Sequence, residues 1–333
     1  MKIFTLGSGA WGLALSNVLA ENGNEVFVYT RHNENKNEIN NSHTLSKYLP
    51  DVFLNKNILA VNDFALLNES DYVLLAVPSK SIKDAIDELN KRLNKKIKII
   101  NATKGLEPST NKRIQEYISL NLNKEFLCDL ASILGPGFAS EVCKHNLTCL
   151  NSVSSSLEFA KEVQNLFSNN YFRVYVSNDV IGSEYGSSIK NAIAIASGLI
   201  KGLGFNENTK SALITRGLAE MTRFGVKNGA NKDTFFGLTG VGDLVLTCNS
   251  EESRNYRFGF LIGKSQNAKK VIEENKITIE GLYTIKVIHQ LAKEENIDTP
   301  IINALYDILY EFKDINLTVQ NLMLRPLKME TFD

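Results

Sequence analysis

The feature that most constrains the fold is a group of three glycines close to the amino terminus. The stretch LGSGAWGLALS, residues 6–16, places Gly7, Gly9 and Gly12 between an apolar run typical of a β-strand and a helix expected from about residue 10 to residue 22. In such a turn Gly7 permits the tight bend, Gly9 lets the backbone approach a pyrophosphate, and Gly12 lets the helix lie close to the strand. The first N–H groups of the helix then face the phosphates. The pattern predicts a dinucleotide site, and a turn that merely connects strand and helix is the alternative.

Short strand-like runs alternate with helical stretches through the first half of the chain. The strand-like runs are KIFTLG, EVFVYT, DYVLLAVP, KIKIINAT, LASILGP and YFRVYVSND. This order is the βαβ pattern of a parallel sheet with crossover helices. From about Val180 onward apolar residues recur at helical spacing and strands disappear. We therefore predict an α/β Rossmann-type dinucleotide-binding domain over residues 1–178, followed by a mostly α-helical substrate-binding and catalytic domain over residues 179–333.

Composition limits the partners and the compartment. The chain has 333 residues, and its 37 basic residues balance 37 acidic ones, so no overall field favours nucleic acid or an anionic membrane. The first apolar run is too short for a secretory signal, and NAIAIASGLI is too short to span a bilayer. The four cysteines lack the spacing of a zinc site or a redox pair, and we expect buried, reduced thiols. These features predict a cytoplasmic protein without nucleic acid, membrane insertion or a metal site.

The end of the second predicted strand bears on the choice of dinucleotide. A fold selective for NAD usually has an acidic side chain there, which binds the ribose 2′-hydroxyl. This chain instead reads VYTRHNE, with Arg31 and His32 at the tip. An arginine pairs with a 2′-phosphate and stacks on adenine, so the residues favour NADP(H) over NAD(H). The alternative is that Arg31 is a solvated loop residue.

Two lysines are candidates for chemistry. Lys104 follows the strand in INATKGLEP, at the sheet edge where ligands bind in α/β folds. In SSIKNAIAIASG, Lys190 stands beside an apolar helical stripe, bordered by Gly186 and Ala194, and these small neighbours leave room for a ligand. In a partly dry pocket near a second cation, the pKa of Lys190 would fall and the side chain could transfer a proton at a carbinol carbon. The alternatives are a surface lysine in a turn for Lys104 and a lysine snorkelling to water for Lys190.

Polar residues that suit an anion follow in two further segments. In GVGDLVLTCNSEESRNYRFG, Asp243 is either the N-cap of a helix or a catalytic carboxylate. Ser253, Arg254 and Asn255 follow it, and their donors and fixed positive charge suit a phosphate dianion. In ILGPGFASE, the turn Gly135–Gly137 comes directly after a strand. Its N–H groups either hold an anion or simply make a turn.

Taken together, these segments resemble one family. GSGAWGLAL, NATKGLE, GPGFASE, IKNAIAIASG, TRGLAEM, GVGDLVLTC, SRNYRFG and IEG look like the successive motifs of bacterial NAD(P)-dependent glycerol-3-phosphate dehydrogenase, in family order from residue 6 to about residue 281. The resemblance implies a Rossmann-type domain, a helical domain, and reversible reduction of dihydroxyacetone phosphate to sn-glycerol 3-phosphate for phospholipid synthesis. The partner implied is thus a small phosphorylated three-carbon substrate. The sequence leaves the oligomeric state, including a homodimer, open.

The resemblance also implies site residues, position by position. Lys190 matches the proton donor and acceptor, with Lys104 and Asp243 beside it in the catalytic set. The cofactor-binding set is Gly7, Gly9, Ala10, Trp11, Gly12, Arg31, His32, Lys104, Ala139, Arg254, Thr278 and Glu280. The substrate-binding set is Lys104, Gly135, Gly137, Lys190, Asp243, Ser253, Arg254 and Asn255.

Two positions depart from the family pattern, and two alternative functions remain. Gly137 stands where the family usually has Ser or Thr, so a hydroxyl to the substrate is missing. Thr278 stands where a Val is frequent. We expect weaker substrate binding at most. A related β-hydroxyacid dehydrogenase would share the glycine turn but would not need SRNYRFG beside GVGDLVLTC. A non-catalytic NADP-sensing module would not need Lys190, Lys104 and Asp243 together.

Overall fold

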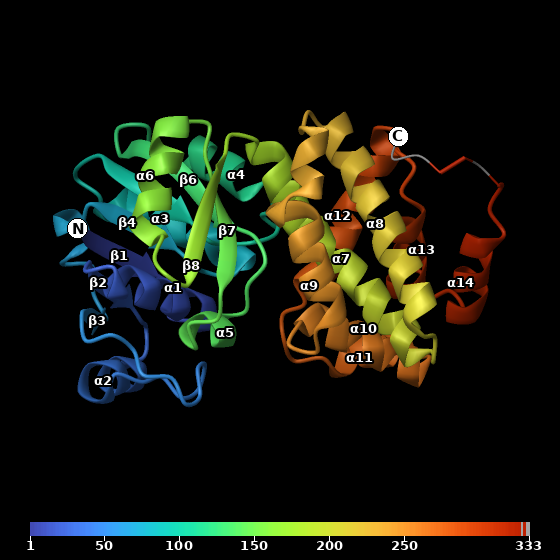
Figure 1. Cartoon of the computed structure of the whole chain (residues 1–333), viewed down its shortest axis with the longest axis horizontal. Coiled ribbons are helices and arrows are strands. Elements are labelled where there is room, and N and C mark those ends of the chain that lie inside the picture. Colours follow the sequence, from blue (N-terminus) through green and yellow to red (C-terminus); the bar gives the residue numbers. More distant parts are fainter. Residues whose placement is uncertain (328, 331–333) are drawn as a thin grey trace. The chain divides into compact units, whose positions relative to one another are not determined.

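The computed structural model describes residues 1–327 and 329–330. It separates into two compact units, one from Met1 to Val180 and one that begins at Ile181 (Figure 1). The two units are defined by their internal contacts alone. The boundary predicted between the functional domains after residue 178 therefore stays a prediction.

The first unit is built on an eight-stranded sheet with the order β3-β2-β1-β4-β5-β6-β7-β8. The strands are β1 (Lys2–Leu6), β2 (Glu25–Tyr29), β3 (Ile58–Val61), β4 (Tyr72–Leu75), β5 (Ile97–Asn101), β6 (Leu127–Leu134), β7 (Thr148–Val153) and β8 (Phe172–Ser177). All neighbours are parallel except β6 and β7. The Rossmann-type prediction is confirmed. The strands β3 and β7 are not among those predicted from the sequence, and neither is the antiparallel pairing of β6 with β7.

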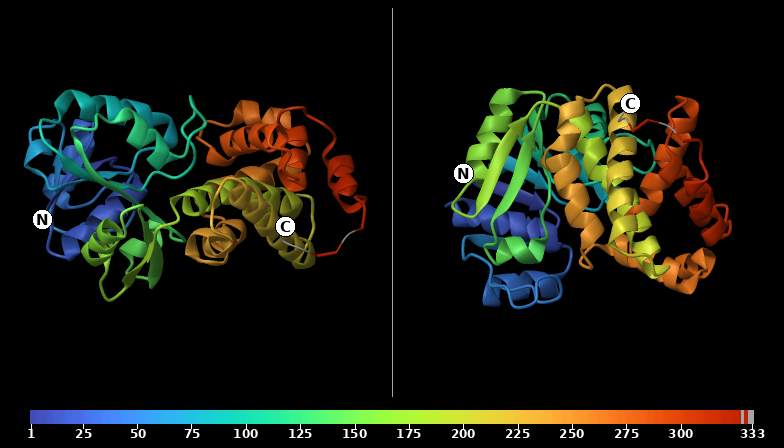
Figure 2. Two further views of the ribbon diagram at one scale, coloured as in Figure 1. Left: turned by 90° about the horizontal axis from the view of Figure 1, so that it is seen from above. Right: turned by 45° about the vertical axis from the view of Figure 1, so that its right-hand side comes forward.

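Helices cover both faces of this sheet (Figure 2). They are α1 (Ala10–Glu21), α2 (Asn33–Ser42), α3 (Ile82–Arg92), α4 (Ile114–Asn121), α5 (Ala139–Cys143) and α6 (Leu157–Phe167), with short 3-10 turns at Leu67–Glu69 and Ser79–Ser81. Successive residues of a strand point to opposite faces. Ile3 therefore packs in one core with α1 and α6, whereas Phe4 packs in another with α3 and α4. Burial on both faces explains why strands such as YVLL are apolar throughout.

The second unit is helical in all its regular elements among the described residues. It comprises α7 (Val180–Gly202), α8 (Glu207–Lys227), α9 (Asp243–Asn249), α10 (Arg254–Ser265), α11 (Ala268–Glu274), α12 (Glu280–Glu294), α13 (Pro300–Leu309) and α14 (Ile315–Met323), with a 3-10 turn at Lys232–Phe236 and a π turn at Leu238–Gly242. The mostly helical prediction is confirmed.

Helix α7 is the centre of the helical unit. It is buried continuously from Gly182 to Ile200, which explains why NAIAIASGLI is apolar on all sides. Helix α10 lies against its backbone, because a Cβ at Gly198 would come within 1.9 Å of the carbonyl oxygen of Tyr256. In the described part of the chain, no helix is both long and apolar enough to cross a bilayer.

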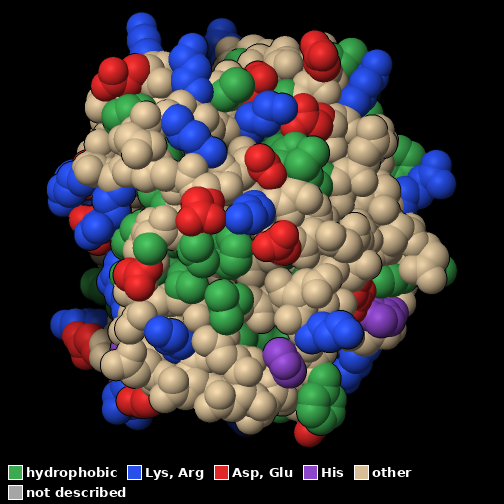
Figure 3. All heavy atoms as spheres, turned by 90° about the vertical axis from the view of Figure 1, so that its left-hand side faces the viewer, with side chains coloured by type: hydrophobic (Ala, Val, Ile, Leu, Met, Phe, Trp, Pro, Cys, Tyr) green, Lys and Arg blue, Asp and Glu red, His purple; other side chains and the backbone are tan. Residues whose placement is uncertain are grey.

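Acidic and basic side chains are interspersed on the face drawn in Figure 3, as the balanced charge leads one to expect.

All four cysteines are free thiols. The prediction that they are buried is right for Cys248 and wrong for Cys128, which is exposed, while Cys143 and Cys149 are half-buried. Cys128 lies near the start of β6, where a strand end meets solvent.

Candidate active site

The glycine turn contains two glycines that the fold requires and one that it does not. Gly7 has φ +123°, and a Cβ there would lie 2.3 Å from the carbonyl oxygen of Ala76. A Cβ at Gly12 would lie 2.1 Å from the carbonyl oxygen of Gly7. A Cβ at Gly9, in contrast, would meet nothing within 4 Å. Packing thus explains Gly7 and Gly12, whereas Gly9 leaves backbone open at the start of α1.

The open backbone at Gly9 fits a dinucleotide pyrophosphate. Gly9 is the N-cap residue of α1 and supplies no side-chain cap, so the first N–H groups of this helix are suited to bind an anion. Trp11, in the same turn, has a buried indole Nε1 without a hydrogen-bond partner among the described residues. Buried donors are normally paired, so a donor left over at this place is consistent with a bound group. Ala10 begins the helix beside them.

Lys104 lies at the carboxyl edge of the sheet, as the sequence predicts. Its Nζ donates to the carbonyl oxygen of Gly135 over 3.0 Å, and it lies 5.5 Å from the ring centroid of Trp11. Gly135 has φ +138°, the left-handed region that glycine adopts readily. Three predicted residues, from the loop after β5, from α1 and from the turn after β6, therefore meet here.

The loop that carries Lys104 is held by its own residues. Glu107 accepts hydrogen bonds from the N–H groups of Ser109 and Thr110, over 3.0 and 2.8 Å, and from both hydroxyls. Burial acts to raise the pKa of Glu107, but these hydrogen bonds outweigh it and hold the pKa below its ordinary value. The loop is thus fixed by an ionised carboxylate only a few residues from Lys104.

Gly137 lies against the indole. A Cβ at this position would come 3.3 Å from Cη2 of Trp11. Ala139 begins α5 and packs partly against the core. The structure therefore brings the turn after β6 and the glycine turn together around one aromatic ring.

Arg31 and His32 lie at the same sheet edge. Because Leu6 of β1 pairs with Tyr29 of β2 in parallel register, Arg31 follows β2 just as the glycine turn follows β1. Both Arg31 and His32 are exposed. His32 is the residue before α2 and does not cap it through its side chain. Their position suits the adenosine side of a dinucleotide, at the neighbouring strand.

In the helical unit, Lys190 is buried against a carboxylate. Lys190 is 5% exposed and Asp243 is 1% exposed. The Lys190 Nζ donates to Asp243 over 2.5 Å and to the hydroxyl oxygen of Thr247 over 3.0 Å. Thr247 in turn donates to the carbonyl oxygen of Asp243 over 2.6 Å. A second cation beside Lys190 would have lowered its pKa, but the structure has an aspartate there.

Two expectations about this cluster are corrected. Asp243 is the first residue of α9 and not its N-cap, which is Gly242, and the Asp243 carboxylate faces Lys190 instead. Gly186 does not leave room for a ligand, because a Cβ there would lie 2.4 Å from the carbonyl oxygen of Thr239. The π turn Leu238–Gly242 packs on Gly186, and such turns are frequent at functional sites.

A second polar group joins the starts of α10 and α12. Asn191, next to Lys190, donates to Glu280 over 3.3 Å, and the Arg254 guanidinium lies 3.8 Å from the same carboxylate. Asn255 accepts from the N–H of Gly281 over 3.0 Å. Arg254 keeps 54% of its side chain exposed, so its charge is accessible to an anion.

The remaining predicted residues have different surroundings. Ser253 caps α10 by accepting from the N–H of Tyr256 over 3.2 Å, so it has a structural duty as well. Thr278 is exposed in the segment before α12, and nothing in the structure explains the Val-to-Thr departure there.

Comparison with known proteins decides the family. Residues 2–160 match the model described as NAD-dependent glycerol-3-phosphate dehydrogenase N-terminus, and residues 179–320 match the C-terminus model of the same name. The chain belongs to this family.

Individual relatives agree over the full length. The NAD(P)+ glycerol-3-phosphate dehydrogenase of Enterococcus faecalis is 44% identical over 330 residues, covering 99% of this chain and 97% of that protein. The one from Oceanobacillus iheyensis is 43% identical over 333 residues, covering 100% and 96%. The crystal structure of glycerol-3-phosphate dehydrogenase from Coxiella burnetii matches with a TM-score of 0.89 at 34% identity, covering 97% of this chain and 99% of that chain.

Membership in the glycerol-3-phosphate dehydrogenase family carries the activity with it. The chain interconverts glycerol 3-phosphate and dihydroxyacetone phosphate with NAD(P), and it acts in lipid metabolism. This assignment replaces both alternatives from the sequence, the related hydroxyacid dehydrogenase and the sensing module.

Sequence reasoning did not single out Asn191 and Thr247 in this glycerol-3-phosphate dehydrogenase. Thr247 lies four residues after Asp243, the spacing that places two side chains on one helix face, so the pattern was available. Asn191 adjoins Lys190 in the chain, but its partner Glu280 is 89 residues away, and no local pattern reveals such a contact.

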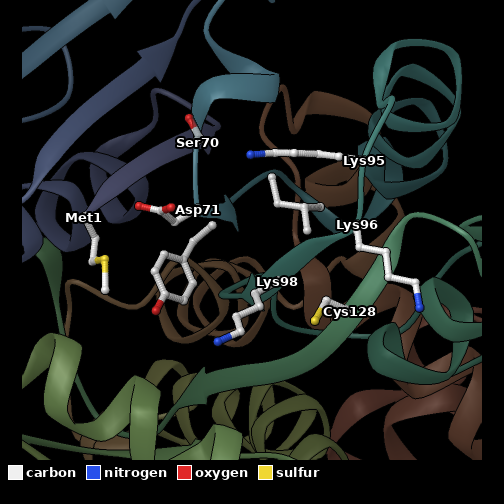
Figure 4. A pocket seen from close by; sticks show the side chains of 9 residues that line it. Met1, Ser70, Asp71, Lys95, Lys96, Lys98 and Cys128 are labelled. Carbon is white, nitrogen blue, oxygen red and sulfur yellow. The ribbon is translucent and has the colours of Figure 1, made fainter.

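Two pockets in the described part of the chain do not contain these residues. A pocket of about 260 Å³ lies at the amino ends of β1, β4 and β5, opposite the edge that carries Lys104, and Lys95, Lys96 and Lys98 line it (Figure 4). A larger apolar pocket of about 1040 Å³ lies among α7, α8, α13 and α14, and no predicted site residue lines it. The candidate site therefore rests on the chemistry and charge of its residues and not on either of these two pockets.

Proposed function

We propose that Lys190 transfers the proton at the C2 oxygen of the substrate. The observation that carries this role is the buried Lys190–Asp243 pair with Thr247 beside it. Bound NAD(P)H supplies the hydride that adds to C2. Lys190 donates its proton to the oxygen left with negative charge, and it takes the proton back in the reverse reaction. Asp243 and Thr247 hold the Nζ in place, and proton transfer of this kind contributes about 10²–10⁴-fold in rate.

Lys104 stabilises the charge that develops on the same oxygen. A positive group that is already oriented acts without reorganisation during the reaction. The hydrogen bond to Gly135 and the contact with Trp11 support this role, because both fix the Nζ before substrate arrives.

Arg254 binds the phosphate of the substrate, with Ser253 and Asn255 beside it. The accessible guanidinium supports this role, since arginine matches phosphate oxygens in a bidentate manner. Binding energy gained at the remote phosphate can orient C2 for the chemical step. Gly137 supplies no hydroxyl, so we expect this chain to bind the three-carbon substrate somewhat less tightly than a serine variant would.

For the cofactor, we propose that NADP(H) is favoured over NAD(H). The exposed guanidinium of Arg31 beside the glycine turn supports this preference. An Arg31→Glu variant should lose selectivity for NADPH over NADH, measured as the ratio of kcat/KM values. An unchanged ratio would show that Arg31 does not select the cofactor.

The wider setting follows the same proposal. The glycerol 3-phosphate formed feeds phospholipid synthesis, and the enzyme works in the cytoplasm. The oligomeric state, for which a homodimer is one possibility, is measured by sedimentation of the purified protein.

One assay tests the activity and the cofactor together. Purified protein is mixed with dihydroxyacetone phosphate, and the absorbance of NADPH and, separately, of NADH is followed. We expect oxidation of both, faster with NADPH. Oxidation with an unphosphorylated 2-keto acid but not with dihydroxyacetone phosphate would contradict the assignment of the substrate.

A further inference from the structure

Trp11 contacts more of the candidate site than a residue that only lined the glycine turn would. It is the single tryptophan of the chain. Its ring lies 5.5 Å from the Lys104 Nζ, and its Cη2 would lie 3.3 Å from a Cβ at position 137. Its Nε1 is buried without a partner among the described residues. One side chain thus adjoins the substrate-side lysine, the Gly135–Gly137 turn and the dinucleotide turn.

We propose that Trp11 is a positioning residue that couples binding of the dinucleotide to the orientation of Lys104. The inference rests on the role proposed above for Lys104. The ring face attracts the ammonium by a cation–π contact. The indole N–H donates to an oxygen of the bound dinucleotide, which fixes the ring and therefore the ammonium above it.

Two of the contacts of Lys104 direct its side chain through uncharged groups. The indole face and the Gly135 carbonyl oxygen are both uncharged, so these two contacts direct the Nζ without neutralising it. Glu107 holds Ser109 and Thr110, a few residues beyond Lys104. The indole face and the Gly135 carbonyl oxygen act on the long side chain of Lys104 itself and direct it.

Gly137 also affects the position of the Trp11 indole. At 3.3 Å, a Cβ on residue 137 would press on the indole by a few tenths of an ångström. The departure from Ser or Thr therefore determines where the ring lies, besides removing a hydroxyl. A Gly137→Ala variant adds this Cβ without any hydroxyl and separates the two effects. We expect it to lower kcat about two- to fivefold.

Two substitutions of Trp11 separate its two functions. Trp11→Phe keeps an aromatic face but removes the N–H that holds the ring to the dinucleotide, so NADPH should bind about tenfold more weakly and kcat at saturating NADPH should fall about two- to fivefold. Trp11→Leu removes both, so NADPH binding weakens similarly and kcat also falls about tenfold or more. NADPH affinity is measured from the emission of the bound nicotinamide, and thermal unfolding checks that each variant folds.

The contact itself is tested without turnover. Because Trp11 is the only tryptophan, its emission reports on the groups beside it. Lys104→Met should change the intensity or wavelength of this emission in the protein without ligands. The matched control is Lys124→Met, an exposed lysine of the same unit, which should leave the emission unchanged.

The outcomes separate this inference from the proposed function. Equal kcat for Trp11→Leu and wild type at saturating NADPH, or unchanged emission in Lys104→Met, would overturn the coupling. If wild type instead failed to reduce dihydroxyacetone phosphate, the proposed function would fail, while the NADPH affinities and the emission would still decide whether Trp11 contacts both groups.

Discussion

The glycine turn and the Lys190 cluster are built in opposite ways. Gly7, Gly9 and Gly12 lie within six positions of the chain, in one strand–turn–helix segment, and Gly7 and Gly12 reach beyond this segment only to the residues that follow β4. Lys190 reaches Asp243 across 53 residues, and Asn191 reaches Glu280 across 89. The first region, which we propose to bind the dinucleotide, is built mainly within one segment of the chain. The second exists only when the helical unit is folded, so its chemistry depends on tertiary packing.

Two buried carboxylates show the same difference. Glu107 accepts from residues two and three positions away, and its pKa lies below the ordinary value despite burial. Glu220 on α8 accepts from the N–H groups of Ile301 and Ile302 at the start of α13, and burial raises its pKa to about 8. Local donors favour the ionised form of Glu107, whereas burial in the helical core favours the protonated, neutral form of Glu220.

The largest effect is expected at Lys190. Lys190→Met should lower kcat about 10²–10⁴-fold with little change in KM, because the proton donor is lost and the phosphate site is kept. Steady-state kinetics with dihydroxyacetone phosphate measure this. A kcat within twofold of wild type would remove the proton role and with it the functional meaning of the long-range cluster.

A smaller effect is expected at Arg254. Arg254→Ala should raise KM for dihydroxyacetone phosphate about tenfold to a hundredfold, since a hydrogen-bonded charge pair to phosphate is lost. Inorganic phosphate should then inhibit the variant less than wild type. If KM stayed the same, the exposed guanidinium would be a surface charge and the phosphate site would lie elsewhere.

Two variants of the glycine turn test the other region of the comparison. Gly12→Ala should cost about 1–3 kcal/mol of stability, because its Cβ meets the Gly7 carbonyl oxygen. Gly9→Ala should leave the thermal midpoint unchanged and weaken NADPH binding. Thermal unfolding and NADPH titration on both variants provide the measurement. A stability loss at Gly9 as large as at Gly12 would mean that the turn is purely structural.

The smallest effect is a pH dependence at Glu220. Since its folded pKa of about 8 lies above the ordinary 4.5, the folded state holds a proton that the unfolded state has lost between these values. The contribution of Glu220 to the free energy of unfolding is complete below pH 4.5. It is lost as the pH rises towards 8, by at most about 1.4 kcal/mol per pH unit. The melting temperature of wild type should thus fall more steeply with pH than that of Glu220→Gln. Parallel curves would contradict this.

Features set by neighbouring residues were predicted from the sequence better than contacts between distant segments. The turn Gly7–Gly12 and the helical character after Val180 follow from periodicity and neighbouring residues. The strands β3 and β7 are short or of mixed polarity, and their pairing is set by the rest of the sheet. Asp243 was left between N-cap and catalytic carboxylate because a sequence pattern does not show which helix approaches it. Gly186 looked like space for a ligand, and only the fold shows the π turn that fills it.

The central claim is that the buried pair in the helical unit performs the proton transfer. The most direct test is a single-turnover reaction of NADPH-saturated Lys190→Met/Asp243→Asn, which removes both buried charges and so avoids leaving one unpaired. We predict that it melts close to wild type and binds NADPH equally well, yet reduces dihydroxyacetone phosphate at least about a hundredfold more slowly. Reduction within twofold of the wild-type rate would contradict the claim.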